Sequence, residues 1–166
     1  MASLWKLPVI YVIENNMYAM GTSVERASAE VELFKRGISF EIEGEEVDGM
    51  DVLAVREAGE KAVKHARAGK GPYILEMKTY RYRGHSMSDP AKYRKREEVD
   101  DIRTHHDPIE GLKGQIIEQG YATEDDLKKI DTEIKAIVKE AADFSLASPE
   151  PDASELWTDV LIEGAA

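Results

Sequence analysis

An uninterrupted apolar run, Val9 to Ile13, constrains the fold more than any other feature of this chain. The run shows no alternation of polar and apolar residues, so it predicts a strand covered on both faces, as in parallel sheets. The polar residues Glu14-Asn15-Asn16 follow it directly. Ligands of open α/β sheets bind beyond the carboxyl ends of the parallel strands, so this Asn pair marks a candidate site.

Strand and helix patterns alternate over the next sixty or so residues. The spacing of apolar residues and the positions of turn residues predict, in order, a short helix over 28–36, a strand over 38–42, a helix from Val52 to Gly69 and a strand over 73–77. Asp51 precedes the longer helix as a capping residue. A β-α-β-α-β succession of this kind predicts an α/β fold with a parallel sheet and right-handed crossovers.

The character of the chain changes after Tyr80. Residues 81–106 are polar and charged, and they predict a long loop with one helical turn near 96–102. Helix signals resume at Asp107-Pro108 and again at Thr123, from which a helix should run to about Leu146. The tail, with Leu156, Trp157 and Leu161, predicts a last short helix or arm. We therefore expect an α/β domain over 1–106, including the loop 81–106, and a helical C-terminal extension over 107–166 packing on it.

Composition narrows the class of function. The 166 residues are 42% hydrophobic, enough for one core, and the formal net charge of −11 opposes long-range attraction to nucleic acid or anionic membranes. There is no cysteine, which fits a reducing compartment, and no stretch is long and apolar enough to span a bilayer. We expect a cytoplasmic protein with no nucleic-acid partner and no membrane association.

Two candidate sites each carry a plainer alternative. Asn15-Asn16 offers oxygen ligands suited to Mg²⁺, but an Asn pair also forms turns through hydrogen bonds to its own backbone. His85 follows a glycine in a loop with Arg81 and Arg83, where a histidine could move protons while the arginines hold an anion. It could equally be an ordinary exposed histidine. The basic, tyrosine-containing stretch 78–96 resembles a nucleic-acid patch, against the acidic remainder of the chain.

Two weaker patterns are interpreted structurally. His105-His106-Asp107 contains metal-ligand residue types, but adjacent histidines point in different directions and Asp107 has a capping role. Gly69-Lys70-Gly71 lies between a helix end and a strand start, whereas phosphate-binding loops lie between a strand end and a helix start.

The chain resembles the alpha subunits of the thiamine-diphosphate-dependent pyruvate dehydrogenase component, in order and over essentially its whole length. The resemblance is carried by Leu7-Pro8-Val9-Ile10-Tyr11-Val12-Ile13-Glu14-Asn15-Asn16, Tyr18-Ala19-Met20-Gly21-Thr22-Ser23, Val47-Asp48-Gly49-Met50-Asp51 and Tyr80-Arg81-Tyr82-Arg83-Gly84-His85-Ser86-Met87-Ser88-Asp89-Pro90. In that family the cofactor motif opens with Gly-Asp-Gly and closes with Asn-Asn. Only the closing half is present, so the resemblance implies the C-terminal portion of such a subunit, inactive by itself.

The resemblance implies a set of site residues. Asn16 would give a side-chain oxygen and Tyr18 a backbone carbonyl to the Mg²⁺ that holds thiamine diphosphate, and His85 would be catalytic and contact the cofactor. Ser86 matches a serine that is phosphorylated in animal relatives, where added charge would disturb the loop. The carboxylate that activates the cofactor belongs to the beta subunit in this family.

The implied activity is oxidative decarboxylation of pyruvate with acyl transfer to lipoyl groups. The implied partners are a beta subunit, in an α2β2 heterotetramer, and a lipoyl-bearing acyltransferase, in the mitochondrial matrix if the source is eukaryotic. Two alternatives remain open: a branched-chain 2-oxo acid dehydrogenase alpha subunit, and a non-catalytic folding or interaction module that uses the basic loop 78–96.

Overall fold

The structure is a computed structural model, and it describes residues 1–158. The chain forms two compact units, one over residues 1–119 and one from residue 120 onward. The boundary expected between residues 106 and 107 stays a prediction.

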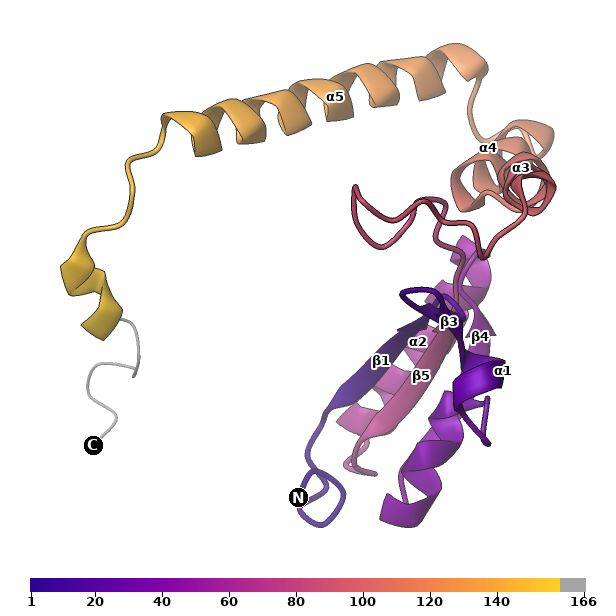
Figure 1. The fold of residues 1–166 in the computed structure, drawn as a ribbon, viewed down its shortest axis with the longest axis vertical. Coiled ribbons are helices and arrows are strands. Elements are labelled where there is room, and N and C mark those ends of the chain that lie inside the picture. The colour runs from indigo at the N-terminus through magenta and orange to yellow at the C-terminus, as the bar shows by residue number, and fades with distance from the viewer. Residues whose placement is uncertain (159–166) are drawn as a thin grey trace. The chain divides into compact units, whose positions relative to one another are not determined.

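A three-stranded parallel sheet organises the first unit. It consists of β1 (Ile10–Asn15), β5 (Tyr73–Lys78) and β4 (Glu43–Asp48), in the order β1-β5-β4 (Figure 1). Asn15 lies opposite Lys78, which in turn lies opposite Asp48, so the three strands end at the same level. The predicted α/β fold with a parallel sheet is therefore confirmed.

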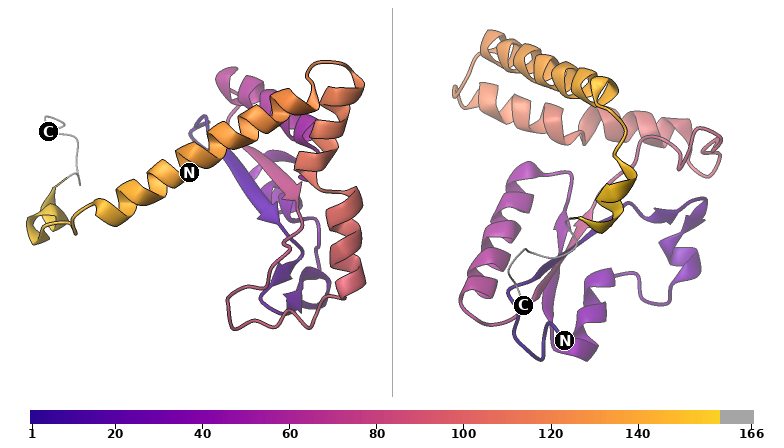
Figure 2. Two further views of the ribbon diagram at one scale, coloured as in Figure 1. Left: turned by 90° about the horizontal axis from the view of Figure 1, so that it is seen from above. Right: turned by 90° about the vertical axis from the view of Figure 1, so that its left-hand side faces the viewer.

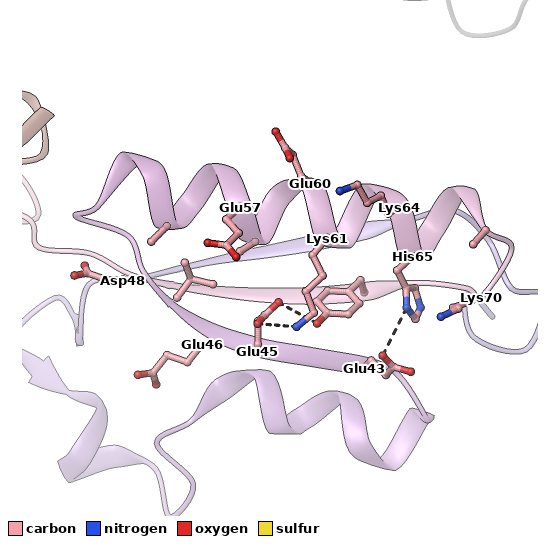
Figure 3. A pocket seen from close by; sticks show the side chains of 15 residues that line it. Glu43, Glu45, Glu46, Asp48, Glu57, Glu60, Lys61, Lys64, His65 and Lys70 are labelled. Carbon is pink, nitrogen blue, oxygen red and sulfur yellow. Dashed lines mark hydrogen bonds and ion pairs between the residues drawn. The ribbon is translucent and has the colours of Figure 1, made fainter. Parts of the chain in front are cut away.

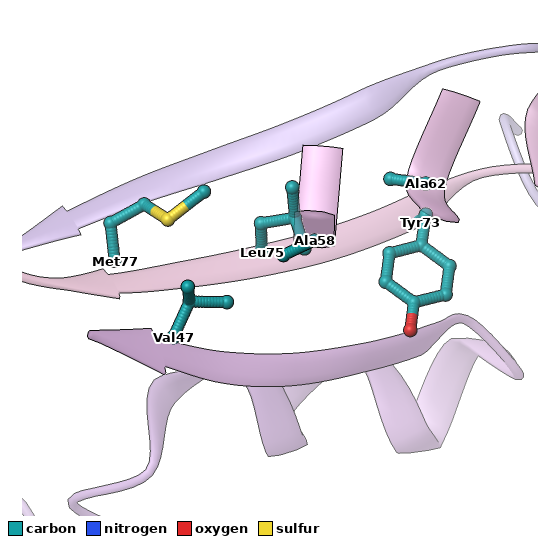
Figure 4. Close-up of a cluster of buried hydrophobic side chains, with 6 residues drawn as sticks. All are labelled: Val47, Ala58, Ala62, Tyr73, Leu75 and Met77. Atoms are coloured by element: carbon teal, nitrogen blue, oxygen red, sulfur yellow. The ribbon is translucent and has the colours of Figure 1, made fainter. Parts of the chain in front are cut away.

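Helix α2 (Val52–Arg67) covers one face of this sheet. The Asp51 side chain accepts hydrogen bonds from the first free N–H groups of the helix, as its position predicts. Ala58 and Ala62 are buried against the strands, and their small side chains let the helix approach closely. Figure 4 shows the resulting core cluster, whose members are Val47, Ala58, Ala62, Tyr73, Leu75 and Met77.

The other face of the sheet carries the 3-10 helix η1 (Leu33–Phe40), so the strands lie between two helices (Figure 2). The strand predicted over 38–42 is wrong, and the helix predicted over 28–36 is found only from Leu33 onward, as the start of η1. Gly37 lets η1 approach β5, since a Cβ there would lie 2.6 Å from Ile74 Cδ1. Glu41, with φ 55°, then ends the helix, and β4 begins only at Glu43.

The apolar strand near the start is less enclosed than its sequence predicts. Val12 is 56% exposed and Tyr11 is 43% exposed, whereas Ile10 packs against the core cluster. The reason is position, because β1 is an edge strand among the described residues. The apolar run thus predicts the strand correctly, but the expected cover on both faces is not found in this part of the chain.

Short elements link β1 to the rest of the unit. A small antiparallel pair, β2 (Tyr18–Ala19) with β3 (Thr22–Ser23), follows β1 and leads into α1 (Val24–Ala27). After β5, a segment without regular structure runs to α3 (Arg96–His105), and α4 (Pro108–Glu118) comes next. Asp107 caps α4, as predicted.

Part of the predicted loop is therefore helical. Residues 96–105 form nearly three turns of helix, where only one turn was expected. The N-cap residue Lys95 makes no side-chain capping bond, so the usual start signal is missing from the sequence. The helix has acidic residues in its first turn and basic residues in its last, an arrangement that complements the helix dipole.

The second unit is dominated by α5 (Glu124–Ala147), followed by the 3-10 helix η2 (Ala153–Trp157). Thr123 and Asp126 form a capping box at the start of α5, as the sequence predicts. Leu161, part of the predicted final arm, lies outside the described residues. Between residues 1 and 158, no helix has both the length and the apolar character needed to cross a membrane.

Candidate functional site

The carboxyl ends of the parallel strands bring two distant chain segments together. The backbone N–H of Thr79 donates to the carbonyl of Asn15 at 3.0 Å, one residue beyond the end of β5. The N–H of Gly49 donates to the carbonyl of Lys78 at 2.8 Å. The Asn pair, the start of the long loop and the Asp48-Gly49 turn therefore share one edge of the sheet, as the parallel arrangement predicts.

Both asparagines fold the chain back on itself immediately after β1. Asn15 Oδ1 accepts from the N–H of Met17 at 2.9 Å, and Asn16 Oδ1 accepts from the N–H of Tyr18 at 3.2 Å. The turn interpretation is thus confirmed. An amide oxygen has two lone pairs, so Asn16 Oδ1 keeps acceptor capacity alongside its long contact with Tyr18.

Arg94 connects this turn to the loop after β5. Its Nη2 donates to the carbonyl of Asn16 at 3.3 Å, and its Nη1 donates to the carbonyl of Arg81. Its guanidinium carbon lies 4.8 Å from the ring centre of Tyr18 and 4.7 Å from that of Tyr80. The ring centre of Tyr93 lies 5.7 Å from the same carbon, and the three rings form a tyrosine cage around Arg94. The Arg94 Nε atom is buried and has no hydrogen-bond partner among the described residues, so stacking on the rings holds this part of the side chain.

The tip of the loop is organised around Asp89. Its carboxylate accepts from the N–H of His85 at 2.7 Å, from the N–H of Ala91 at 2.8 Å and from the Tyr93 hydroxyl at 2.8 Å. These hydrogen bonds, the one from His85 above all, hold the pKa of Asp89 below its ordinary value. Asp89 is therefore ionised near neutral pH, and the loop tip has a fixed backbone.

His85 itself contributes its backbone to this network. Its N–H is bound by Asp89, and its carbonyl accepts from Arg81 Nη2 at 3.1 Å, while the residue as a whole is exposed. The next residue, Ser86, is also exposed, with its Oγ 3.0 Å from Ser88 Oγ. The imidazole is thus presented on a tethered backbone, without being buried.

Two tyrosines anchor the base of the loop to the helices that follow. The Tyr80 hydroxyl donates to Glu98 at 2.9 Å, and burial, followed by this carboxylate, raises the pKa of Tyr80 to about 12. The Tyr82 hydroxyl donates to Asp107 at 2.9 Å, with the Arg103 guanidinium 5.1 Å from the Tyr82 ring. Tyr80 therefore remains a protonated hydrogen-bond donor near neutral pH.

The structure relates most of the predicted residues to one another, and it adds some that the sequence did not single out. Asn16, Tyr18 and the His85 loop are joined through Arg94 and Arg81. The interleaved tyrosines and arginines of 78–96 were the available signal, but the sequence analysis considered them only as a nucleic-acid patch, opposed by the acidic remainder, or as an interaction loop. Within the described residues, Arg94 and Arg81 direct hydrogen bonds to backbone carbonyls of this same chain.

The two weaker patterns lie at a helix end and in a turn, and Asp107 caps α4. Residues 1–158 contain no group of three or more His, Cys, Asp or Glu side chains placed to hold a metal ion. His105 Nδ1 instead contacts Asp101 Oδ1 at 2.9 Å, one helical turn earlier. Gly69 and Gly71 have φ of 70° and 105°, and they connect the end of α2 to β5.

A groove of about 1030 Å³ lies away from the Asn turn, between α2 and the outer edge of β4 (Figure 3). Several of its polar groups pair with one another. Glu45 accepts from Lys61 Nζ at 3.0 Å and from the Tyr73 hydroxyl at 3.0 Å, and His65 lies 3.6 Å from Glu43. Neither Asn16 nor His85 lines this groove, so size alone does not identify the site.

Fold and geometry together define an α/β protein with a candidate ligand site where the Asn turn and a basic loop meet at the carboxyl ends of parallel strands. Comparison with known proteins identifies the family within this class. The profile of the dehydrogenase E1 component matches residues 1–154, and the chain belongs to that family.

Individual relatives agree with this assignment. The chain is 62% identical over 162 residues to the pyruvate dehydrogenase E1 component subunit alpha of Rhizobium meliloti (strain 1021), covering 98% of this chain and 47% of the relative. The corresponding subunit of Zymomonas mobilis is 58% identical, with 98% and 46% covered. The somatic mitochondrial form of Homo sapiens is 52% identical over 157 residues, with 94% and 40% covered. The chain thus spans about half the length of the curated relatives it matches.

Proposed function

We propose that this chain is the part of a pyruvate dehydrogenase alpha subunit that closes the thiamine diphosphate and Mg²⁺ site and carries its active-site loop. The observation that carries the proposal is the contact of Arg94 with Asn16, which joins the turn after β1 to the loop that presents His85. The identity of 62% to a named pyruvate dehydrogenase alpha subunit supports pyruvate as the substrate, in preference to branched-chain 2-oxo acids.

The residues present fit the proposed metal. Asn16 offers an amide oxygen and Tyr18 a backbone carbonyl, and neutral oxygen donors of this kind suit Mg²⁺, which combines a few protein ligands with phosphate oxygens and water. Both donors belong to one turn at the end of β1. Asn16 and Tyr18 would thus supply two ligands of the ion, and the cofactor's diphosphate would supply others.

The other residues of the site would orient the cofactor and exchange a proton with the reacting groups. Thiamine diphosphate supplies the electron sink for decarboxylation, and the protein supplies orientation and charge neutralisation. His85 is exposed on a backbone tied to Asp89 and Arg81, which supports a role in exchanging a proton during transfer of the acyl group to a lipoyl arm. The working enzyme would contain a beta subunit, in an α2β2 assembly, and would deliver acyl groups to a lipoyl-bearing acyltransferase.

The metal assignment is tested at Asn16, in a polypeptide that carries this chain together with the Gly-Asp-Gly half of the motif and is assembled with its beta subunit. Asn16→Ala should weaken Mg²⁺-dependent thiamine diphosphate binding about tenfold or more, measured by titration calorimetry. Asn16→Asp keeps an oxygen at the same place and should retain binding. Unchanged affinity in Asn16→Ala would leave Asn16 with its turn role alone.

A further inference from the structure

A buried carboxylate lies directly behind the Asn turn, and the proposed chemistry does not use it. Glu76, in the middle of β5, is 0% exposed, and its side chain is on the face of the sheet opposite α2. Its Oε1 accepts from Asn15 Nδ2 at 2.6 Å, and its Oε2 accepts from the backbone N–H of Phe34 at 2.8 Å. Lys78 Nζ lies 3.2 Å from Oε1 and 3.2 Å from Glu46 Oε2.

This carboxylate dictates which way the amide of Asn15 points. Burial alone would raise the pKa of Glu76, but hydrogen bonds from Asn15, Phe34 and Lys78 lower it below its ordinary value. An ionised carboxylate can only accept hydrogen bonds, so Asn15, itself 4% exposed, must turn its NH₂ group toward Glu76. Its oxygen is thereby turned toward the N–H of Met17, which it accepts at 2.9 Å.

The orientation of Asn15 matters because the turn that it caps is not one the backbone would adopt freely. Met17 has φ 68°, in the left-handed region that a residue with a Cβ rarely occupies. The hydrogen bond from Met17 to Asn15 Oδ1 is one of the contacts that hold it there. Asn16 and Tyr18, the proposed ligands, lie on either side of Met17, so their oxygens depend on this conformation.

Stability alone does not account for a carboxylate in this place. A buried ion pair is often no more stabilising than apolar side chains of similar volume, because desolvation offsets the attraction. What Glu76 adds is direction, since it joins β1, β5 and the start of η1 through hydrogen bonds with fixed donors.

We propose that Glu76 is a positioning residue, which acts through Asn15 to hold the turn that presents Asn16 and Tyr18 to Mg²⁺. The inference rests on the proposed function. Glu76 has no described hydrogen bond to Asn16 or Tyr18, and its proposed effect passes through its hydrogen bond with Asn15.

The test measures binding in the assembled enzyme by titrating thiamine diphosphate at saturating Mg²⁺. Glu76→Gln replaces one acceptor oxygen by an NH₂ group, so Asn15 and Phe34 can no longer both be satisfied. We expect the dissociation constant to rise about tenfold, the size usual for a residue that orients a metal ligand. Asn15→Asp keeps an oxygen for Met17 but loses the donor to Glu76, and it should shift affinity in the same direction.

Leu75→Ala is the matched control. Leu75 neighbours Glu76 on β5, is 2% exposed and faces the α2 side of the sheet. The Leu75→Ala variant should lower the melting temperature while leaving the dissociation constant within about twofold, because Leu75 takes no part in the hydrogen-bond network of Glu76. If Glu76→Gln acted only through a general loss of stability, Glu76→Gln and Leu75→Ala would change the dissociation constant to the same extent.

A double-mutant cycle separates the proposed route from a general effect. In an Asn15→Ala background, Glu76→Gln should cause little further loss of affinity, since the link that it acts through is already gone. Parent-like affinity in Glu76→Gln, or an equal loss in both backgrounds, would overturn the inference. If the parent itself showed no Mg²⁺-dependent binding, the proposed function would be wrong, and the inference would fall with it.

Discussion

The Arg94 guanidinium donates to the backbone carbonyl of Asn16 at 3.3 Å, across 78 positions of sequence. The same side chain also donates to the carbonyl of Arg81 and stacks on the rings of Tyr18 and Tyr80. One residue therefore holds the loop after β5 against the turn after β1.

Replacing Arg94 by Lys should loosen the loop. A lysine keeps the charge but loses the planar fork that reaches two carbonyls at once, and it loses the stacking on the tyrosines. We expect chymotrypsin to cleave the loop roughly fivefold faster, as for a loss of about 1 kcal/mol of local stability. Arg96→Lys, at an exposed position two residues later, is the control. Equal cleavage rates for parent and Arg94→Lys would show that the tyrosine cage does not order the loop.

The order of the loop tip should depend on pH through Asp89. Its pKa is lowered in the folded chain, chiefly by the N–H of His85, so the stabilisation is present above the ordinary pKa and is lost as the pH falls through the lowered one. Amide exchange at His85 and Ala91, corrected for intrinsic rates, should stay protected until the pH falls below about 4. Asp89→Asn should lose most of that protection at neutral pH. Protection that fades near pH 6 would point to a histidine as the controlling group.

His85→Ala should separate catalysis from stability. The described contacts of His85 in the loop network use its backbone N–H and carbonyl, which alanine retains. In the assembled enzyme, acyl transfer from pyruvate should fall about a hundredfold or more, the usual contribution of a general acid or base. The melting temperature should stay within a few degrees of the parent. His106→Ala, at an exposed position, should leave the rate unchanged. A fall in stability that matches the fall in rate would make His85 a structural residue.

Charge at Ser86 should inactivate the assembled enzyme. Ser86 lies next to His85, and in the described residues its side-chain hydroxyl contacts the hydroxyl of Ser88, while its backbone carbonyl accepts from the N–H of Asp89. Ser86→Glu adds a negative charge near the proposed diphosphate and offers the loop arginines a competing partner. Activity should fall sharply and protease cleavage of the loop should rise. Ser86→Gln, equal in size but neutral, and Ser86→Ala should retain much of the activity. Full activity and unchanged protection in Ser86→Glu would place the loop away from the diphosphate.

Local signals in the sequence determined most of the regular structure. The caps at Asp51, Asp107 and Thr123 were read correctly, because capping depends on residues within one turn of the helix start. The parallel sheet also followed from the sequence, since a succession of strands and helices leaves few topologies. The Asn pair and His85 loop were likewise visible as motifs at strand ends.

The tertiary structure decided what the sequence pattern could not. The strand predicted over 38–42 is displaced to Glu43–Asp48, because pairing with β5 and the close approach at Gly37 outweigh a local alternation of apolar residues. The hydrogen bond from Arg94 to Asn16 joins residues 78 positions apart, and the one from Asn15 to Glu76 joins residues 61 positions apart. Such contacts depend on which strand ends become neighbours, and no local propensity encodes that. The sequence by itself therefore determined the elements and the candidate donors, while only the packed sheet decided how those donors are oriented.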